Sequence, residues 1–150
     1  MEALTVVMRI LHILSAVMLV GGFTFLLVAM LPATRLLDED LRKQIATLAR
    51  RSFYKISHSA ITLLLLTGAF NWYINFQDYR DVPNKGLVQG LLGMKALLGI
   101  VLAVLLFGEA FGVIKPKGQG LTKLVVVLGV IVIIMAAVVR HLRMGVPVAG

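Results

Sequence analysis

The chain has 150 residues, of which 59% are hydrophobic and only 15% are charged. A soluble domain carries roughly 45–50% apolar and about 25% charged residues. This composition, with a mean hydropathy of +0.95, excludes an ordinary soluble domain and indicates a polytopic membrane protein. The lack of cysteine excludes disulfides, iron–sulfur clusters and thiolate metal sites.

The net charge of +8 does not indicate nucleic-acid binding in this chain. Its basic residues lie in short connections between apolar segments, without interleaved aromatic residues. Such a distribution is typical of membrane topology signals and of contacts with anionic lipid headgroups. The lipid bilayer is therefore the expected partner, and no nucleic-acid partner is expected.

Four apolar segments are each long enough to cross about 30 Å of hydrocarbon, which takes roughly 20 residues. They lie at about residues 4–31, 53–76, 87–114 and 121–143. The first is too long for the apolar region of a signal peptide and is expected to be retained as a helix. Because the connections are short, neighbouring segments are expected to run antiparallel. The sequence predicts an all-α fold, with one domain of four transmembrane helices in an up-down-up-down bundle.

Lysine and arginine are unevenly distributed between the two sides of this predicted bundle, with nine on one side and five on the other. An excess of basic residues marks the cytoplasmic side. Both termini are therefore expected on the outer side of a bacterial-type cytoplasmic (inner) membrane. The nine lie in the first and third connections, namely Arg35, Arg42, Lys43, Arg50, Arg51, Lys55, Lys115, Lys117 and Lys123, and the five are Arg9, Arg80, Lys85, Arg140 and Arg143.

Two features of the connections add detail to this topology. Residues Asp38–Arg51 are expected to form a short surface helix, because leucine and isoleucine recur there at spacings of four and three. Trp72, Tyr73 and Tyr79 lie where an outer aromatic belt belongs.

A polar layer is predicted in the outer half of the bundle. Ionisable side chains at hydrocarbon depth are costly and usually face the protein interior with a functional role. A rise of 1.5 Å per residue places His12 roughly 9–12 Å, and Lys95 about 12 Å, below the outer surface. Together with residues nearer the helix ends they are the candidate cofactor-binding residues, namely His12, Lys95, His141, Arg9 and Arg140.

The three histidines, His12, His58 and His141, are the candidate metal ligands, because neutral imidazole suits iron and copper. His58 is expected in a separate inner layer, at a depth roughly 14 Å from that of His12. Two axial ligands of one metal lie about 4 Å apart. His12 and His58 are therefore not expected to share one iron, whereas His12 and His141 are closer but need a shift of register.

Each of these residues also has a purely structural interpretation. His12 can simply hydrogen-bond across a helix interface, and His58 and His141 can be solvated near the headgroups. Lys95 can extend outward to the interface, and Glu109 can pair with Lys115 or Lys123. The small residues that share a helix face with His12, namely Ser15, Ala16 and Gly22, leave room either for a flat cofactor or for another helix.

The first three apolar segments resemble the copper resistance protein D family. Leu11-His12 followed by Val20-Gly21-Gly22 is similar to its Leu-His and Trp-x-Gly-Gly pattern, with Leu19 in place of the tryptophan. Leu66-Thr67-Gly68 and Asn71 match Leu-Thr-Gly-x-x-Asn, and Leu91-Leu92, Lys95 and Leu98 match Leu-Leu-x-x-Lys-x-x-Leu. The likeness covers roughly residues 8–112.

A second resemblance is to the small bacterial membrane protoporphyrinogen oxidases, which have about four helices. His12, Tyr54 and Lys95 can be aligned with their pattern, although Leu91-Leu92-Gly93 replaces a Trp-Leu-His and the acidic terminal motif is missing. Both resemblances imply a membrane bundle with a histidine-based site for copper or haem b.

Three functions follow as hypotheses. The first is a haem b-binding protein that transfers electrons, between quinol and a partner redox protein. The second is copper transport or resistance, with His12, Met18 and Met94 as ligands to Cu(I). The third is a non-catalytic subunit of a larger respiratory-type membrane complex. No Ser-His-Asp arrangement, phosphate loop or paired carboxylates point to hydrolysis or nucleotide chemistry, so any enzymatic role is expected in a membrane oxidoreductase.

Overall fold

The computed structural model describes residues 2–75, 85–111, 113–114 and 119–144, and within them all regular structure is helical. The elements in chain order are α1 (Glu2–Phe25), η1 (Leu26–Met30), α2 (Leu31–Ala33), η2 (Thr34–Leu36), α3 (Glu39–Asn75), α4 (Lys85–Ala110) and α5 (Gly120–Met144). The all-α class predicted from the sequence is thereby confirmed.

Four helical stretches are long and apolar enough to cross a membrane. By length and hydropathy they are Ala3–Leu36, Glu39–Ile74, Lys85–Glu109 and Gly120–Leu142. A helix of about 20 residues already spans the hydrocarbon. The structure thus has the four membrane-length helices that the sequence predicted.

The first of these stretches ends in a distorted turn around a proline. Pro32 has no backbone N–H to donate to the preceding turn. Immediately before it, η1 is a π-helical turn in which the Leu31 N–H donates to the Leu26 carbonyl. After η2 the backbone becomes extended at Leu37 (φ −97°, ψ 156°), and the chain reverses into α3.

The helix α3 is 37 residues long, which corresponds to about 55 Å. It begins at Glu39, well before the Phe53 expected for the second span. Residues 39–51 are therefore the first part of α3 and do not form a separate surface helix. The physical reason is that no glycine or proline interrupts the chain between Glu39 and Gly68, so nothing ends the helix at the membrane surface.

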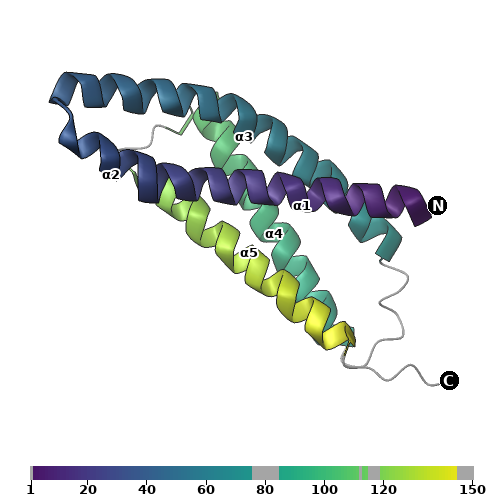
Figure 1. Ribbon diagram of the computed structural model, residues 1–150. Coiled ribbons are helices and arrows are strands. Elements are labelled where there is room, and N and C mark those ends of the chain that lie inside the picture. Colours follow the sequence, from purple (N-terminus) through teal and green to yellow (C-terminus); the bar gives the residue numbers. More distant parts are fainter. Residues whose placement is uncertain (1, 76–84, 112, 115–118, 145–150) are drawn as a thin grey trace.

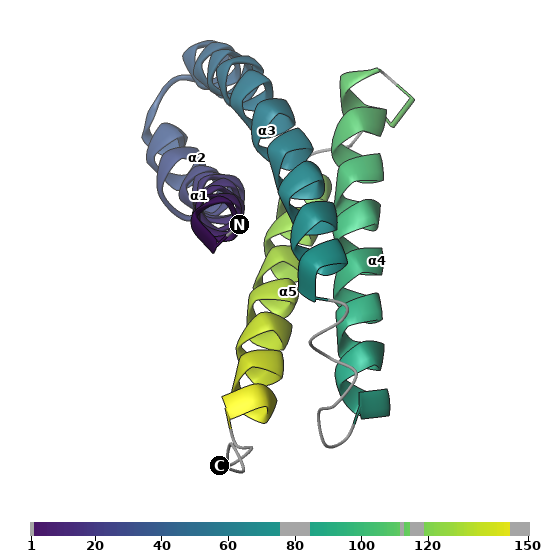
Figure 2. The same cartoon turned by 90° about the vertical axis from the view of Figure 1, so that its right-hand side faces the viewer.

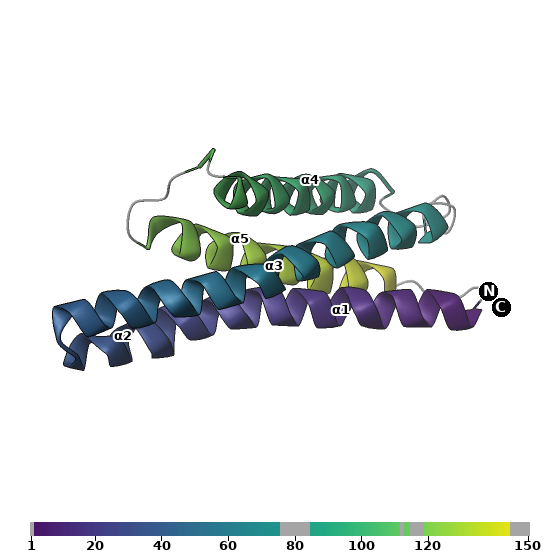
Figure 3. The same ribbon diagram turned by 90° about the horizontal axis from the view of Figure 1, so that it is seen from above.

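The four long helices form a closed arrangement in which each contacts two others. α1 packs most closely on α3, and α4 on α5, while α1 also contacts α5 and α3 contacts α4 (Figures 1 and 2). α1 begins and α5 ends at the same end of the molecule, and at the other end α1, α2 and the start of α3 extend beyond α4 and α5 (Figure 3).

The apolar core is concentrated away from the N-terminal part of α1. Its members come from the second halves of α1 and α4, the start of η1, the middle of α3 and the start of α5, namely Leu19, Phe23, Leu26, Ala60, Ile61, Leu102, Ala103, Leu106, Leu121 and Val125. Toward the N-terminal end of α1, this helix and α5 diverge (Figure 1). Most other large apolar side chains of the described residues point outward, among them Val17, Val28, Val104 and Ile134.

Several sequence-based expectations lie outside the described residues. These are the placement of Tyr79 in an aromatic belt, the positions of Arg80, Lys115 and Lys117, and the pairing of Glu109 with Lys115. Of the other predicted belt residues, Trp72 and Tyr73 are exposed near the end of α3.

Candidate functional site

The His12 imidazole is held in the interface between α1 and α3. Its Nδ1 lies 3.0 Å from the Thr67 hydroxyl oxygen, a hydrogen bond between residues 55 positions apart. His12 is half-buried, whereas Thr67 is almost fully buried. The purely structural interpretation of His12 was a hydrogen bond across a helix interface. The contact with Thr67 agrees with it for the Nδ1 side of the ring.

The hydrogen bonds of Thr67 favour a proton on Nδ1 of His12. The Thr67 hydroxyl donates to the Leu63 carbonyl at 2.7 Å, which uses its single proton. When Thr67 makes this donation, its oxygen accepts from the Nδ1–H of His12, and the Leu64 backbone is a further hydrogen-bond partner of the ring. In the neutral imidazole this assignment leaves Nε2 with a lone pair, which is the form of histidine that ligates a metal.

Gly68 and Lys95 complete the surroundings of this ring. A Cβ atom on Gly68 would lie 3.2 Å from His12 Cε1, so glycine allows α3 to approach the imidazole closely. Lys95 is half-buried on α4, and its ammonium group lies within electrostatic range of His12. His12, Thr67 and Gly68 are thus in contact, with Lys95 within electrostatic range of the ring, and we call these four residues the His12 site.

The remaining predicted cofactor residues lie apart from this site. Arg9, Arg140 and His141 are exposed. Within the described part of the chain, no hydrogen bond or ion pair connects them to His12. Their roles in cofactor binding stay predictions.

His58 belongs to a different layer. Both of its ring nitrogens face backbone carbonyl oxygens, Nδ1 that of Tyr54 and Nε2 that of Leu106, at 3.2 Å for the latter. His58 precedes Thr67 by nine residues on α3, a separation of about 13 Å along the helix. In this arrangement neither nitrogen of His58 points toward the His12 site.

Beside His58, α3 and α4 are joined by a polar contact that the sequence did not predict. The Tyr54 hydroxyl donates to the Glu109 carboxylate. Phe107 contacts the His58 ring, at 5.5 Å between ring centres. A carboxylate at this depth needs a hydrogen-bond donor, and the Tyr54 hydroxyl supplies one. The sequence indicated only Lys115 and Lys123 as partners of Glu109, so it did not identify Tyr54.

Two glycines further along the helix interfaces of α1 serve helix packing. A Cβ on Gly22 would lie 2.2 Å from the Phe53 ring, and one on Gly129 would lie 2.6 Å from Val20. Of the two roles considered for the small residues on this face of α1, Gly22 thus accommodates a neighbouring helix. Within the described residues, no group of three or more histidine, cysteine, aspartate or glutamate side chains is placed to hold a metal ion.

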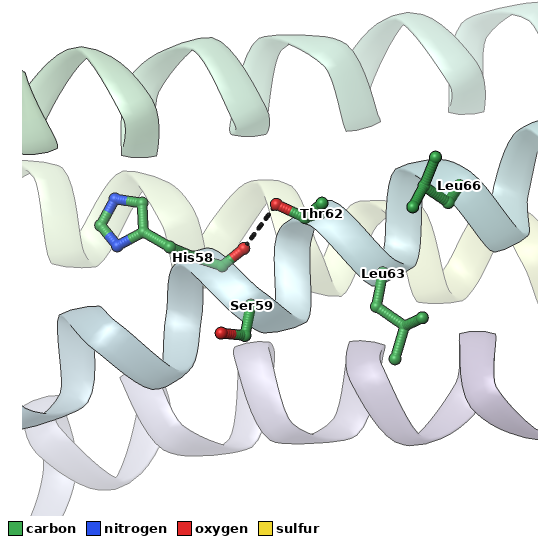
Figure 4. Close-up of a pocket in the computed structure, with 5 residues that line it drawn as sticks. All are labelled: His58, Ser59, Thr62, Leu63 and Leu66. Atoms are coloured by element: carbon green, nitrogen blue, oxygen red, sulfur yellow. Dashed lines mark hydrogen bonds between the residues drawn. The ribbon is translucent and has the colours of Figure 1, made fainter.

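An open depression of about 500 Å³ lies on the outward face of α3. His58, Ser59, Thr62, Leu63 and Leu66 line it, and α4 and α1 flank it on either side (Figure 4). The short side chains here donate to carbonyls of their own helix, Thr62 to His58 at 2.8 Å and Ser59 to Lys55 at 3.3 Å.

These features define an all-helical protein with four helices of membrane-spanning length and a histidine-centred polar site between α1, α3 and α4. The chain matches no protein-family model, no curated protein and no solved structure.

Proposed function

We propose that this chain is an integral membrane protein that binds haem b and transfers electrons. Its four helices cross the membrane as an up-down-up-down bundle, with both termini on the outer side of a bacterial-type cytoplasmic membrane. The outward-facing apolar side chains support insertion, because a soluble protein rarely exposes large contiguous apolar surface. The basic residues between α1 and the middle of α3 support the orientation.

The orientation is testable by cysteine labelling, because the chain contains no cysteine of its own. Leu36, at the turn before α3, is 92% exposed, and Gly86, at the start of α4, is also exposed. A membrane-impermeant maleimide added to intact cells is expected to label Gly86→Cys, and to label Leu36→Cys only after permeabilisation. The reverse pattern would contradict the proposed orientation, and labelling of both in intact cells would contradict the crossing itself.

The arrangement around His12 carries the haem proposal. Thr67 fixes the imidazole through Nδ1, and Nε2 retains a lone pair. None of the residues of the His12 site belongs to the main apolar cluster. Histidine is a common axial ligand of haem iron, and cations pair with haem propionates. The residues present therefore fit this group.

In this proposal each residue has a distinct task. His12 would ligate the iron, Thr67 would orient the imidazole and maintain its tautomer, and Lys95 would neutralise a propionate. Arg9 and Arg140 would be further candidates to pair with propionates, and His141 would be the further candidate ligand of the iron. Haem b supplies one-electron transfer, for which quinol or a redox partner protein is the proposed donor or acceptor.

A visible spectrum tests the proposal. The full chain, purified in detergent from cells supplied with haem precursor, is expected to show a Soret band and a reduced-minus-oxidised difference spectrum. The same protein without haem should regain both on titration with haemin. A protein that shows no Soret band after either treatment would contradict haem binding.

The structure supports the copper hypothesis and the subunit hypothesis less than it supports the haem proposal. Met18 and Met94 are each more than half exposed, so neither is directed into the His12 site as a copper ligand would be. A role as a non-catalytic subunit predicts co-purification with larger proteins and no bound haem, and the same spectrum distinguishes it from the haem proposal.

A further inference from the structure

The depression on α3 lies in the part of the helix that the proposed orientation places in the membrane. Two short side chains, Ser59 and Thr62, are among the residues that line the depression. Their hydroxyl protons are already donated to carbonyls of α3, so the floor presents no unsatisfied donor. Leu63 and Leu66 provide an apolar lining (Figure 4). A surface of this kind suits a hydrocarbon chain.

Two cations lie on the same stripe of α3, just before the depression. Residues at spacings of three and four share one face of a helix, which aligns Arg51 and Lys55 with Ser59 and Thr62. Both are exposed, and within the described part of the chain neither forms an ion pair. They therefore present two positive charges at one end of an apolar hollow.

The distance along α3 from the cations to the far end of the depression matches the hydrocarbon thickness of one leaflet. Lys55 and Leu66 are eleven residues apart, which corresponds to about 16 Å. Half of the hydrocarbon thickness is about 15 Å. With Arg51 and Lys55 at the level of the headgroups, the depression extends through the acyl-chain region of the same leaflet.

We propose that this surface binds one anionic glycerophospholipid of the cytoplasmic leaflet. Arg51 and Lys55 bind its phosphate, and an acyl chain lies over Ser59, Thr62 and Leu66. The inference rests on the proposed membrane insertion and orientation, and it is independent of haem binding at the His12 site.

Native mass spectrometry of the full chain in detergent tests this inference. The protein is incubated with equal amounts of phosphatidylglycerol and phosphatidylcholine that carry the same acyl chains. We expect one phosphatidylglycerol to be retained per chain in preference to phosphatidylcholine. Equal retention of the two lipids, or a dimer of the chain that carries no lipid, would overturn the proposal.

Two variants test the two halves of the surface. Arg51→Gln/Lys55→Gln is expected to lower phosphatidylglycerol retention on the order of tenfold, because each basic residue near the surface favours anionic lipid. Thr62→Phe, which fills the hollow and keeps both cations, should also lower retention. Arg42→Gln/Lys43→Gln removes the same charge earlier on α3, beyond reach of the depression, and should retain the lipid. Equal losses in both double variants would contradict a specific site.

Carbonate extraction separates a failure of this inference from a failure of insertion. A chain that stays in carbonate-washed membranes but shows no preference for phosphatidylglycerol overturns the lipid site alone. A chain released by carbonate overturns the membrane proposal as well.

Discussion

Replacing His12 with alanine is expected to remove the Soret absorbance of the purified protein. Among the three histidines, His12 is the one whose ring is held by a side chain across the α1–α3 interface, whereas both ring nitrogens of His58 face backbone carbonyls and His141 is exposed. The loss of His12 would remove the nitrogen ligand that the proposal assigns to the iron. The measurement is the ratio of bound haem to protein after titration with haemin, compared with the wild type.

The Thr67 hydroxyl provides a more sensitive version of the same test. Thr67→Val keeps the shape of the side chain but removes the acceptor for His12 Nδ1–H. Loss of an outer partner of a metal-bound histidine typically lowers affinity about 10- to 100-fold. A loss of that size is expected for haem binding to Thr67→Val.

Thr62→Val is the matched control for this substitution. Thr62 is on the same helix, is exposed, and donates only to its own backbone at His58. It should bind haem as the wild type does. Unchanged haem binding in His12→Ala would contradict the proposed site, and equal effects of the two threonine variants would show that Thr67 does not act through His12.

The architecture was largely predictable because it depends on local properties of the chain. Apolar runs of more than 20 residues with short connections specify long helices, and the structure contains four of them. The start of α3 was not predictable from hydropathy. Its first part, from Glu39 to Arg51, is polar, and its continuity with the apolar part follows from the lack of a helix breaker.

The depth of the site residues along the helices could be predicted from the sequence, but the side chains that they contact could not. Counting residues at a fixed rise placed His12 and Lys95 at one level, and the structure puts them within electrostatic range of each other. The Thr67 partner of His12 is 55 residues away, as is the Glu109 partner of Tyr54. Such pairs depend on how the helices are rotated, which is decided by the packing of Gly22 on Phe53 and of Gly68 on His12.

Gly22→Ala is expected to destabilise the protein, and the neighbouring Gly21→Ala is not. A Cβ on Gly22 would lie 2.2 Å from two carbons of the Phe53 ring, whereas a Cβ on Gly21 would meet nothing within 4 Å. The Phe53 ring is edge-to-face with Phe23, at 4.9 Å between centres, so it cannot move without disturbing the core. Overpacking of this kind typically costs about 1–3 kcal/mol.

The two variants form a matched pair, because they make the same chemical change at adjacent positions of α1. Alanine favours a helix over glycine by about 1 kcal/mol, so Gly21→Ala should unfold at the same temperature as the wild type or higher. Thermal unfolding of the detergent-solubilised chain measures both.

Phe53→Leu shortens the side chain that the new methyl group meets, so it should recover part of the stability lost in Gly22→Ala. The double-mutant cycle should therefore give a coupling energy between the two positions. If Gly22→Ala and Gly21→Ala unfold together, or if Phe53→Leu adds its cost independently, the close contact between α1 and α3 at this point is wrong.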